Sequence, residues 1–257
     1  METMRLDQAL VALGYYESRE QAQRALLAGE LEINGLRDAK AGQRINLKTD
    51  TDIPEIYCGK NKINIVVREK SPFVSRGAYK IAAALDAFKI DPTDMLVLDI
   101  GASTGGFTDC VLQRGARKVF AVDCGYGQLH DKIRKDARVI SMEKTNARFL
   151  SKEQIPEIPQ LVVVDVSFIS LKLILPAIQA VSEKGTIVVT LVKPQFEVGR
   201  DKIKKGGVVT DPQARLEAVE MICQEMLNLG WEIIGSIESP IIGPAGNHEF
   251  LVGATIA

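Results

Sequence analysis

Four polar side chains in the C-terminal part of the chain have types that suit proton movement. Asp165 ends the apolar run "LVVVD", Lys193 directly follows "TIVVTLV", and Glu249 opens the last apolar run in "NHEFLV". Lys80 lies on a helix that we expect to begin at "SRG". Any one lysine or glutamate is usually a solvated residue. Together they are informative, because α/β folds place their chemistry at the ends of strands.

These residue types suit the activation of a hydroxyl group. A lysine accepts a proton only where burial and a second nearby cation disfavour its charged form, whereas arginine stays protonated. We expect Lys193 to accept or orient the proton, and Lys80 to set the local field and contact a nucleic-acid backbone. Asp165 would orient one ammonium group and Glu249 the other.

A glycine-containing turn in "DIGASTGGFTD", residues 99–109, predicts a bound ligand. Its glycine spacing differs from the G-x-G-x-x-G dinucleotide pattern, which disfavours a nicotinamide-dependent oxidoreductase. Asp99 would repel phosphates but suits an ammonium or sulfonium group. Asp123, at the end of the next apolar run, is placed to accept from two ribose hydroxyls. A ribose and a cationic amino-acid tail describe S-adenosylmethionine, although a tight turn with two solvated acids remains the alternative.

Alternating apolar runs and helical patterns predict the elements that position these residues. We expect strands at 95–100, 118–122, 139–142, 161–165, 186–191, 231–237 and 249–256. Helices are expected at 76–88, 104–114, 127–134, 170–181 and 212–229. This alternation predicts a doubly wound α/β sheet. The link between the last two strands is too short for a crossover helix, so the last strand should be antiparallel.

The first 60 residues follow a different pattern. We expect a helix over 5–13, a second helix capped by Ser18 and Gln21, and a hairpin at Asn34-Gly35 in "LEINGLR". Such a small α+β domain buries little core and should depend on a neighbour or ligand. The predicted organisation is therefore a small domain over 1–60, a linker over 61–75, and the α/β domain over 76–257.

Composition restricts the class of protein. The formal net charge is −1, so any RNA-binding face must be local. The chain has four scattered cysteines and two histidines, which predicts no metal site and reduced thiols in the cytoplasm. No apolar run approaches the roughly 18 residues of a membrane span.

The chain resembles the FtsJ-type ribose 2′-O-methyltransferases, and in particular their TlyA branch, whose members carry haemolysin A names. The segments that carry this resemblance are "SRGAYK", "LDIGASTGGFTD", "VFAVDCG", "VVVDVSF", "LVKPQFE" and "NHEF". The N-terminal segment resembles the RNA-binding domain named after the fourth small-subunit ribosomal protein. The resemblance implies a Rossmann-like class I methyltransferase domain with a seven-stranded sheet, acting with S-adenosylmethionine on cytidine riboses of ribosomal RNA.

The resemblance also implies particular site residues. Its catalytic set falls on Lys80, Asp165, Lys193 and Glu249. Its cofactor contacts fall on Asp99, Gly101, Ser103, Gly105, Asp123 and Asn146. The basic residues that we expect on RNA are Arg5, Arg19, Arg24, Lys40, Arg44, Arg76, Lys202, Lys204 and Lys205.

Two questions stay open at the level of sequence. Residues 193–209 form a charged segment that is either a mobile loop closing over RNA or a solvated surface loop. The function itself has two rivals to the methyltransferase: a non-catalytic RNA-binding assembly factor and a membrane-lytic haemolysin. The presence of all four polar positions disfavours the first, and the lack of an amphipathic or spanning segment disfavours the second.

Overall fold

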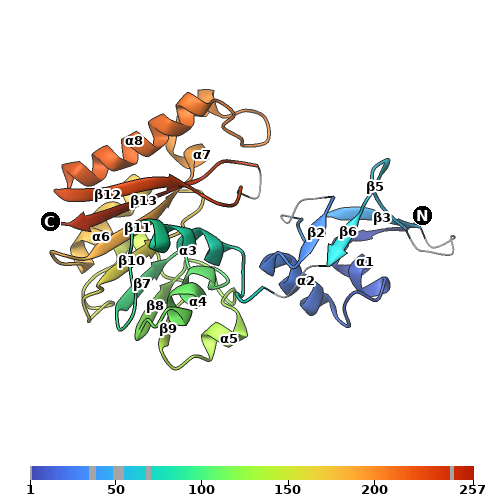
Figure 1. Ribbon diagram of the computed structural model, residues 1–257, viewed down its shortest axis with the longest axis horizontal. Coiled ribbons are helices and arrows are strands. Elements are labelled where there is room, and N and C mark those ends of the chain that lie inside the picture. The colour runs from blue at the N-terminus through green and yellow to red at the C-terminus, as the bar shows by residue number, and fades with distance from the viewer. Residues whose placement is uncertain (1, 35–38, 49–54, 68–70, 244–245) are drawn as a thin grey trace. The chain divides into compact units, whose positions relative to one another are not determined.

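The computed structural model describes residues 2–34, 39–48, 55–67, 71–243 and 246–257, which form two compact units. The first unit spans Met1–Arg76 and the second spans Gly77–Ala257. Each unit has its own strands and helices (Figure 1).

The first unit packs two short helices with small antiparallel sheets. Helix α1 (Leu6–Ala12) and helix α2 (Arg19–Ala28) contact each other and contribute the apolar side chains of a small core. Strands β1 (Glu2–Arg5), β3 (Arg44–Lys48), β4 (Glu55–Cys58) and β5 (Asn61–Lys62) form one sheet in that order. Ser18 caps α2 as expected, since its hydroxyl accepts from the Gln21 amide at 3.2 Å.

The prediction of a hairpin at Asn34-Gly35 in this unit is wrong. Strand β2 (Leu31–Ile33) pairs antiparallel with β6 (Ile65–Val67), about thirty residues away, and not with the run that follows it. Gly35, at the expected turn, lies outside the described residues. The stretch 61–75, which we expect to link the domains, contains strands β5 and β6, both within the first unit.

The second unit contains the expected seven-stranded sheet. Its order is β12-β13-β11-β10-β7-β8-β9. Five strands run parallel: β7 (Leu96–Ile100), β8 (Lys118–Val122), β9 (Val139–Met142), β10 (Leu161–Val164) and β11 (Ile187–Val192). The last strand β13 (Phe250–Ile256) lies between β11 and β12 (Trp231–Glu238) and is antiparallel to both, which confirms the expected orientation.

Helices cover both faces of this sheet. Helices α3 (Gly77–Ala87) and α4 (Gly106–Gln113) pack against each other on one face, while α6 (Leu175–Val181) and α8 (Pro212–Asn228) join the core on the other (Figure 1). Strands β7 and β10, in the middle of the sheet, bury both of their faces, which is the reason for their continuous apolar sequences.

Two helices differ from the sequence expectation. The segment 170–181 divides into the 3₁₀ turn η2 (Leu171–Leu173) and α6, because Pro176 supplies no amide hydrogen and suits the first turn of a new helix. Helix α5 (Asp131–Arg134) begins four residues later than expected, since His130 caps it and the preceding loop lines a pocket.

Candidate active site

The register of the sheet brings three of the four polar residues to one edge. Val164 of β10 pairs with Thr190 of β11 in parallel, and Val192 of β11 pairs with Phe250 of β13 in antiparallel register. The residues that follow β10 and β11, Asp165 and Lys193, therefore lie at the same edge as Glu249, which precedes β13. Lys80 reaches this edge from α3, as its contact with Glu249 shows.

The four residues form two ion pairs, in which both lysines and Glu249 are buried and Asp165 is half-buried. Lys80 Nζ lies 2.6 Å from Glu249 Oε2, and Lys193 Nζ lies 2.7 Å from Asp165 Oδ1. Both lysines are 8% exposed and Glu249 is 1% exposed. Removing charges from water is costly, so each ammonium group at this depth needs its carboxylate partner. Two lysines at the same edge of the sheet, each paired with a carboxylate, can hold or move a proton.

A serine that the sequence did not single out completes the surroundings of Lys193. Lys193 Nζ donates a hydrogen bond of 2.7 Å to Ser167 Oγ. Next to this serine, Phe168 adopts a positive φ of 64° and is 92% exposed, with its ring 5.3 Å from that of Phe196. Ser167 and Phe168 lie in the segment "VVVDVSF" that carries the family resemblance, but their residue types alone indicated no chemical role.

The glycine turn brings the neighbouring strand close to the site. Gly101 has φ +85°, and a Cβ there would overlap the carbonyl oxygen of Asp165. Gly105, with φ +90°, caps α4, and a Cβ there would lie 2.9 Å from Leu129. Only glycine satisfies both the backbone conformation and the space at these two positions. The turn therefore sets the position of Asp165.

Asp99 is a buried acid with an unsatisfied oxygen. It is fully buried, and Thr108 Oγ1 on α4 donates to its Oδ2 at 2.6 Å. Within the described residues its Oδ1 has no hydrogen-bond partner. Burial raises the pKa of Asp99 to about 7, and the charges of Asp165 and Asp123 add to the rise, while the bond from Thr108 opposes it. A cationic group or donor on a ligand would satisfy this oxygen.

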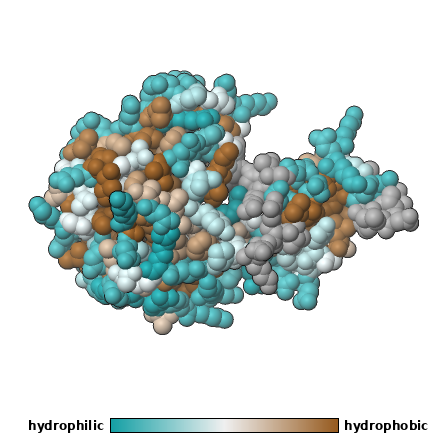
Figure 2. Space-filling model, viewed as in Figure 1, coloured by the Kyte–Doolittle hydropathy of each residue, from teal (hydrophilic) through white to brown (hydrophobic). Residues whose placement is uncertain are grey.

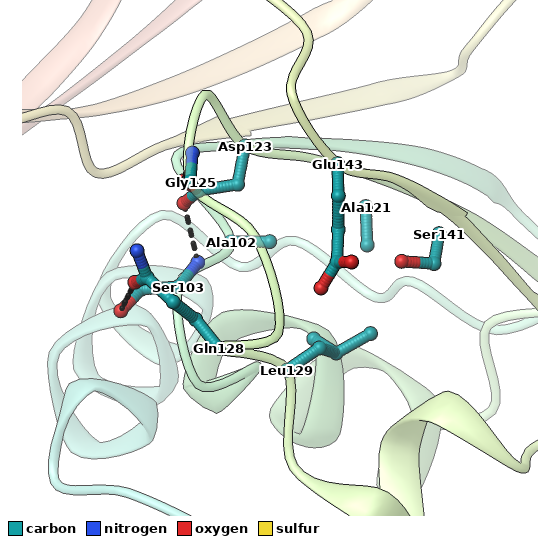
Figure 3. Close-up of a pocket in the computed structure, with 9 residues that line it drawn as sticks. All are labelled: Ala102, Ser103, Ala121, Asp123, Gly125, Gln128, Leu129, Ser141 and Glu143. Atoms are coloured by element: carbon teal, nitrogen blue, oxygen red, sulfur yellow. Dashed lines mark hydrogen bonds between the residues drawn. The ribbon is translucent and has the colours of Figure 1, made fainter.

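A pocket lies beside the turn at the ends of β8 and β9 (Figure 3). Asp123 accepts from the amide of Ser103 at 2.8 Å and from the amide of Gly125 at 2.7 Å, so its carboxylate is fixed in orientation. Each carboxylate oxygen can accept a second hydrogen bond, which leaves capacity for ligand hydroxyls. Glu143, which the sequence did not indicate, lines the same pocket and accepts from the amide of Gly127 at 3.0 Å.

The expected cofactor residues do not all meet in this pocket. Ser103 and Asp123 line it, and the remaining lining residues are Ala102, Ala121, Gly125, Gln128, Leu129, Ser141 and Glu143. Asn146 is exposed and caps the 3₁₀ turn η1 (Ala147–Phe149), where its side chain accepts from the Arg148 amide at 3.1 Å. Asn146 follows the lining residue Glu143 by three positions in the chain, but it does not line the pocket.

Two of the expected RNA-binding arginines surround one buried acid in the first unit. Arg5 donates twice to Asp7, at 3.0 Å each, and Arg19 approaches the same carboxylate at 3.6 Å. Their side chains are 44% and 51% exposed, so both guanidinium groups also face solvent. The hydrogen bond from Arg5 is the main reason that the pKa of Asp7 falls to about 2. A carboxylate that stays charged at neutral pH holds both arginines in place.

The other expected RNA-binding residues are dispersed. Arg76 is half-buried, and Lys202 forms an ion pair with Glu217. Exposed positions are occupied by Arg24, Lys40, Arg44, Lys204 and Lys205.

The charged segment 193–209 is ordered at its end. Asn247, which is 1% exposed, accepts from the Val209 amide at 2.9 Å and donates to the Gly207 carbonyl at 2.8 Å. Its start forms helix α7 (Pro194–Glu197), and a 3₁₀ turn η3 follows at Arg200–Lys202.

Two searches of the described residues bear on the alternatives. They contain no group of three or more His, Cys, Asp and Glu that could hold a metal ion. Within the same residues, every helix is too short or too polar to cross a membrane. The face shown in Figure 2 mixes hydrophilic and hydrophobic residues on both units.

Comparisons with known proteins agree with this geometry. A family model described as FtsJ-like methyltransferase matches residues 73–256, and one for the S4 domain matches residues 4–48. The chain is 42% identical to the 16S/23S rRNA (cytidine-2′-O)-methyltransferase TlyA of Mycobacterium tuberculosis, over 96% of this chain and 88% of the relative. It is 40% identical to Hemolysin A of Brachyspira hyodysenteriae, over 96% and 98% of the two chains. A solved Streptococcus thermophilus structure with a hemolysin name is similar at a TM-score of 0.74 and 40% identity, covering 100% and 90%.

Proposed function

The chain belongs to the FtsJ-like methyltransferase family and carries an S4 domain, and from this premise we propose that it methylates the ribose 2′-oxygen of a cytidine in ribosomal RNA. The observation that carries the proposal is the pair of buried lysine–carboxylate contacts, Lys80–Glu249 and Lys193–Asp165. They lie at the sheet edge to which the glycine turn and the pocket also belong. A non-catalytic RNA-binding factor has no use for two buried lysines there, because their burial costs stability.

The residues of the turn and pocket fit S-adenosylmethionine. The free oxygen of buried Asp99 suits a cationic amino group, and the fixed carboxylate of Asp123 suits ribose hydroxyls. When bound, S-adenosylmethionine would supply a methyl group on positively charged sulfur for transfer to the 2′-oxygen.

Lys193 is the group that receives the proton of the 2′-hydroxyl. Its nitrogen sits at the strand end beside Asp165, whose main chain contacts the glycine turn. Asp165 holds the charge that forms on Lys193 after proton transfer. Lys80, held by Glu249, is the second lysine of the set and is placed to contact the backbone of the RNA.

The first unit supplies affinity for RNA. Arg5 and Arg19, fixed by Asp7, present two guanidinium groups that match phosphate oxygens. Such contacts are independent of sequence, so we place the choice of nucleotide in the second unit. The substrate is ribosomal RNA within a ribosomal subunit, and the protein acts in the cytoplasm.

Mapping of methylated riboses tests this function. Ribosomal subunits from a strain without the modification are incubated with the protein and S-adenosylmethionine, and primer extension at low nucleotide concentration locates new 2′-O-methyl groups. We expect one or a few cytidine stops that require both components. Tight RNA binding with no new stop, and no heat of S-adenosylmethionine binding at millimolar concentration, would instead establish the assembly factor.

A further inference from the structure

We propose that Ser167 is a positioning residue that sets the direction in which Lys193 accepts the proton. This inference rests on the proposed function, because it assigns Ser167 a role only through Lys193. The observation is the hydrogen bond of 2.7 Å that Lys193 Nζ donates to Ser167 Oγ.

The two oxygens around Lys193 play different parts. The contact with Asp165 Oδ1 is an ion pair, and attraction between charges depends weakly on angle. The hydrogen bond to Ser167 is directional, since such bonds weaken steeply away from linearity. Asp165 therefore supplies charge, whereas Ser167 supplies orientation.

A neutral lysine makes this orientation decisive. Its nitrogen carries two hydrogens and one lone pair, and only the lone pair can take a proton. With one hydrogen on Ser167 Oγ and the other drawn towards Asp165, the lone pair occupies the one direction left. Without Ser167 the amine can rotate about its Cε–Nζ bond and turn a hydrogen towards the substrate. The 2′-hydroxyl proton can then pass to Nζ only in some of the rotamers about the Cε–Nζ bond.

The turn that carries Ser167 is anchored on both sides. At its start, the Asp165 amide donates to the Ile100 carbonyl at 2.9 Å. At its end, the Leu171 amide donates to Glu197 Oε1 at 2.9 Å, and Ser170 Oγ donates to Oε2 of the same carboxylate at 2.5 Å. Glu197 lies on α7, the helix that begins directly after Lys193. This short helix therefore fixes Lys193 and, through Glu197, the turn that carries Ser167.

Substitution of Ser167 separates orientation from folding, because this residue is exposed. We expect Ser167→Ala to lower kcat about tenfold, which is the upper end of the range for one hydrogen bond between neutral groups. The KM for ribosomal RNA and the Kd for S-adenosylmethionine should stay within about twofold, because Ser167 is not among the residues assigned to hold either substrate. Ser167→Thr keeps the hydroxyl and should restore kcat to within about threefold. Ser236→Ala, an equally exposed serine on β12, is the matched control and should leave kcat unchanged.

Glu197→Gln tests the anchor. If Glu197 acts through Ser167, the double variant should lose no more kcat than Ser167→Ala alone. Wild-type kcat in Ser167→Ala, or no recovery of kcat in Ser167→Thr, would overturn the role of Ser167. The proposed function would still stand in that case if Lys193→Ala were inactive. Wild-type turnover in Lys193→Ala would overturn both together.

Discussion

Asp99 combines complete burial with an oxygen that no described residue satisfies, and its pKa of about 7 places its titration near neutral pH. In the free protein at pH 7 the carboxyl is therefore about half protonated. A cationic ligand group binds the charged form, so ligand binding and proton release are linked at this residue.

Asp99 should make the binding of S-adenosylmethionine depend on pH. The affinity for S-adenosylmethionine should rise with pH from 6 to 7.5 and level off above, approaching tenfold per unit well below pH 7, because the bound state requires the carboxylate. Calorimetric titration across this range measures the slope. Asp99→Asn should bind more weakly and lose most of the pH dependence that the protein contributes. An unchanged slope in that variant would exclude Asp99 as the group responsible.

Single residues differ in how far the sequence could reveal them. Asp99, Asp165 and Lys193 end apolar runs, and an ionisable side chain at a buried strand end is a readable signal. Ser167, Thr108 and the other contacts that orient them carry no such signal, since their role depends on which distant side chain folding brings near. The sequence could therefore indicate the charged groups of the candidate site but not their hydrogen-bond partners.

At the level of elements, the Gly101 turn couples strand β7 to Asp165. Gly101→Ala should destabilise the protein and lower turnover, because its new Cβ must displace the Asp165 main chain. The matched control is Gly185→Ala, where the glycine has a similar positive φ of +90° but open space around the added Cβ. We expect about 1 kcal/mol of destabilisation in the control and at least twice that in Gly101→Ala. Equal losses by thermal or denaturant unfolding would contradict a role for the close contact.

The turn between β10 and α6 presents Phe168 beside the lysine site. A ring that is 92% exposed, in a backbone conformation unfavourable for phenylalanine, suggests that it contributes to binding rather than to the core. Stacking of a nucleobase on an aromatic ring contributes roughly 1–3 kcal/mol. Phe168→Ala should raise the KM for ribosomal RNA about tenfold and leave S-adenosylmethionine binding unchanged. Leu227→Ala, a half-exposed apolar residue on α8, serves as the control, and equal KM values in both variants would refute the stacking role.

Elements of the second unit were predictable because each is amphipathic or buried over its full length. The antiparallel last strand follows from a link without room for a helix. The first unit was less predictable, because β2 and β6 are three residues each and pair across about thirty residues. Short strands carry too little periodicity to indicate a distant partner, and a local Asn-Gly signal then favours the wrong pairing.

At the scale of the whole molecule, we propose that the first unit supplies affinity for RNA and the second unit carries out methyl transfer. Arg19→Ala should weaken binding to ribosomal RNA and reduce by about 1 the slope of log affinity against log salt concentration, because one phosphate contact is lost. Filter binding at several salt concentrations measures both quantities. Arg138→Ala, which removes an arginine next to the amino end of β9, should change neither. A slope in Arg19→Ala equal to that of the unsubstituted protein would remove Arg19 from the RNA interface.

Turnover of Lys193 variants tests the central claim most directly. The rate of methyl transfer to ribosomal RNA is measured for Lys193→Ala and Lys193→Arg, with S-adenosylmethionine affinity determined by calorimetry on the same samples. We expect kcat to fall by at least about a hundredfold in both variants, because arginine keeps the charge but cannot accept a proton, while cofactor affinity stays within about twofold. Lys172→Ala, the substitution of a half-buried lysine that pairs with Glu225, should remain fully active. Full turnover in either Lys193 variant would contradict proton acceptance by this lysine.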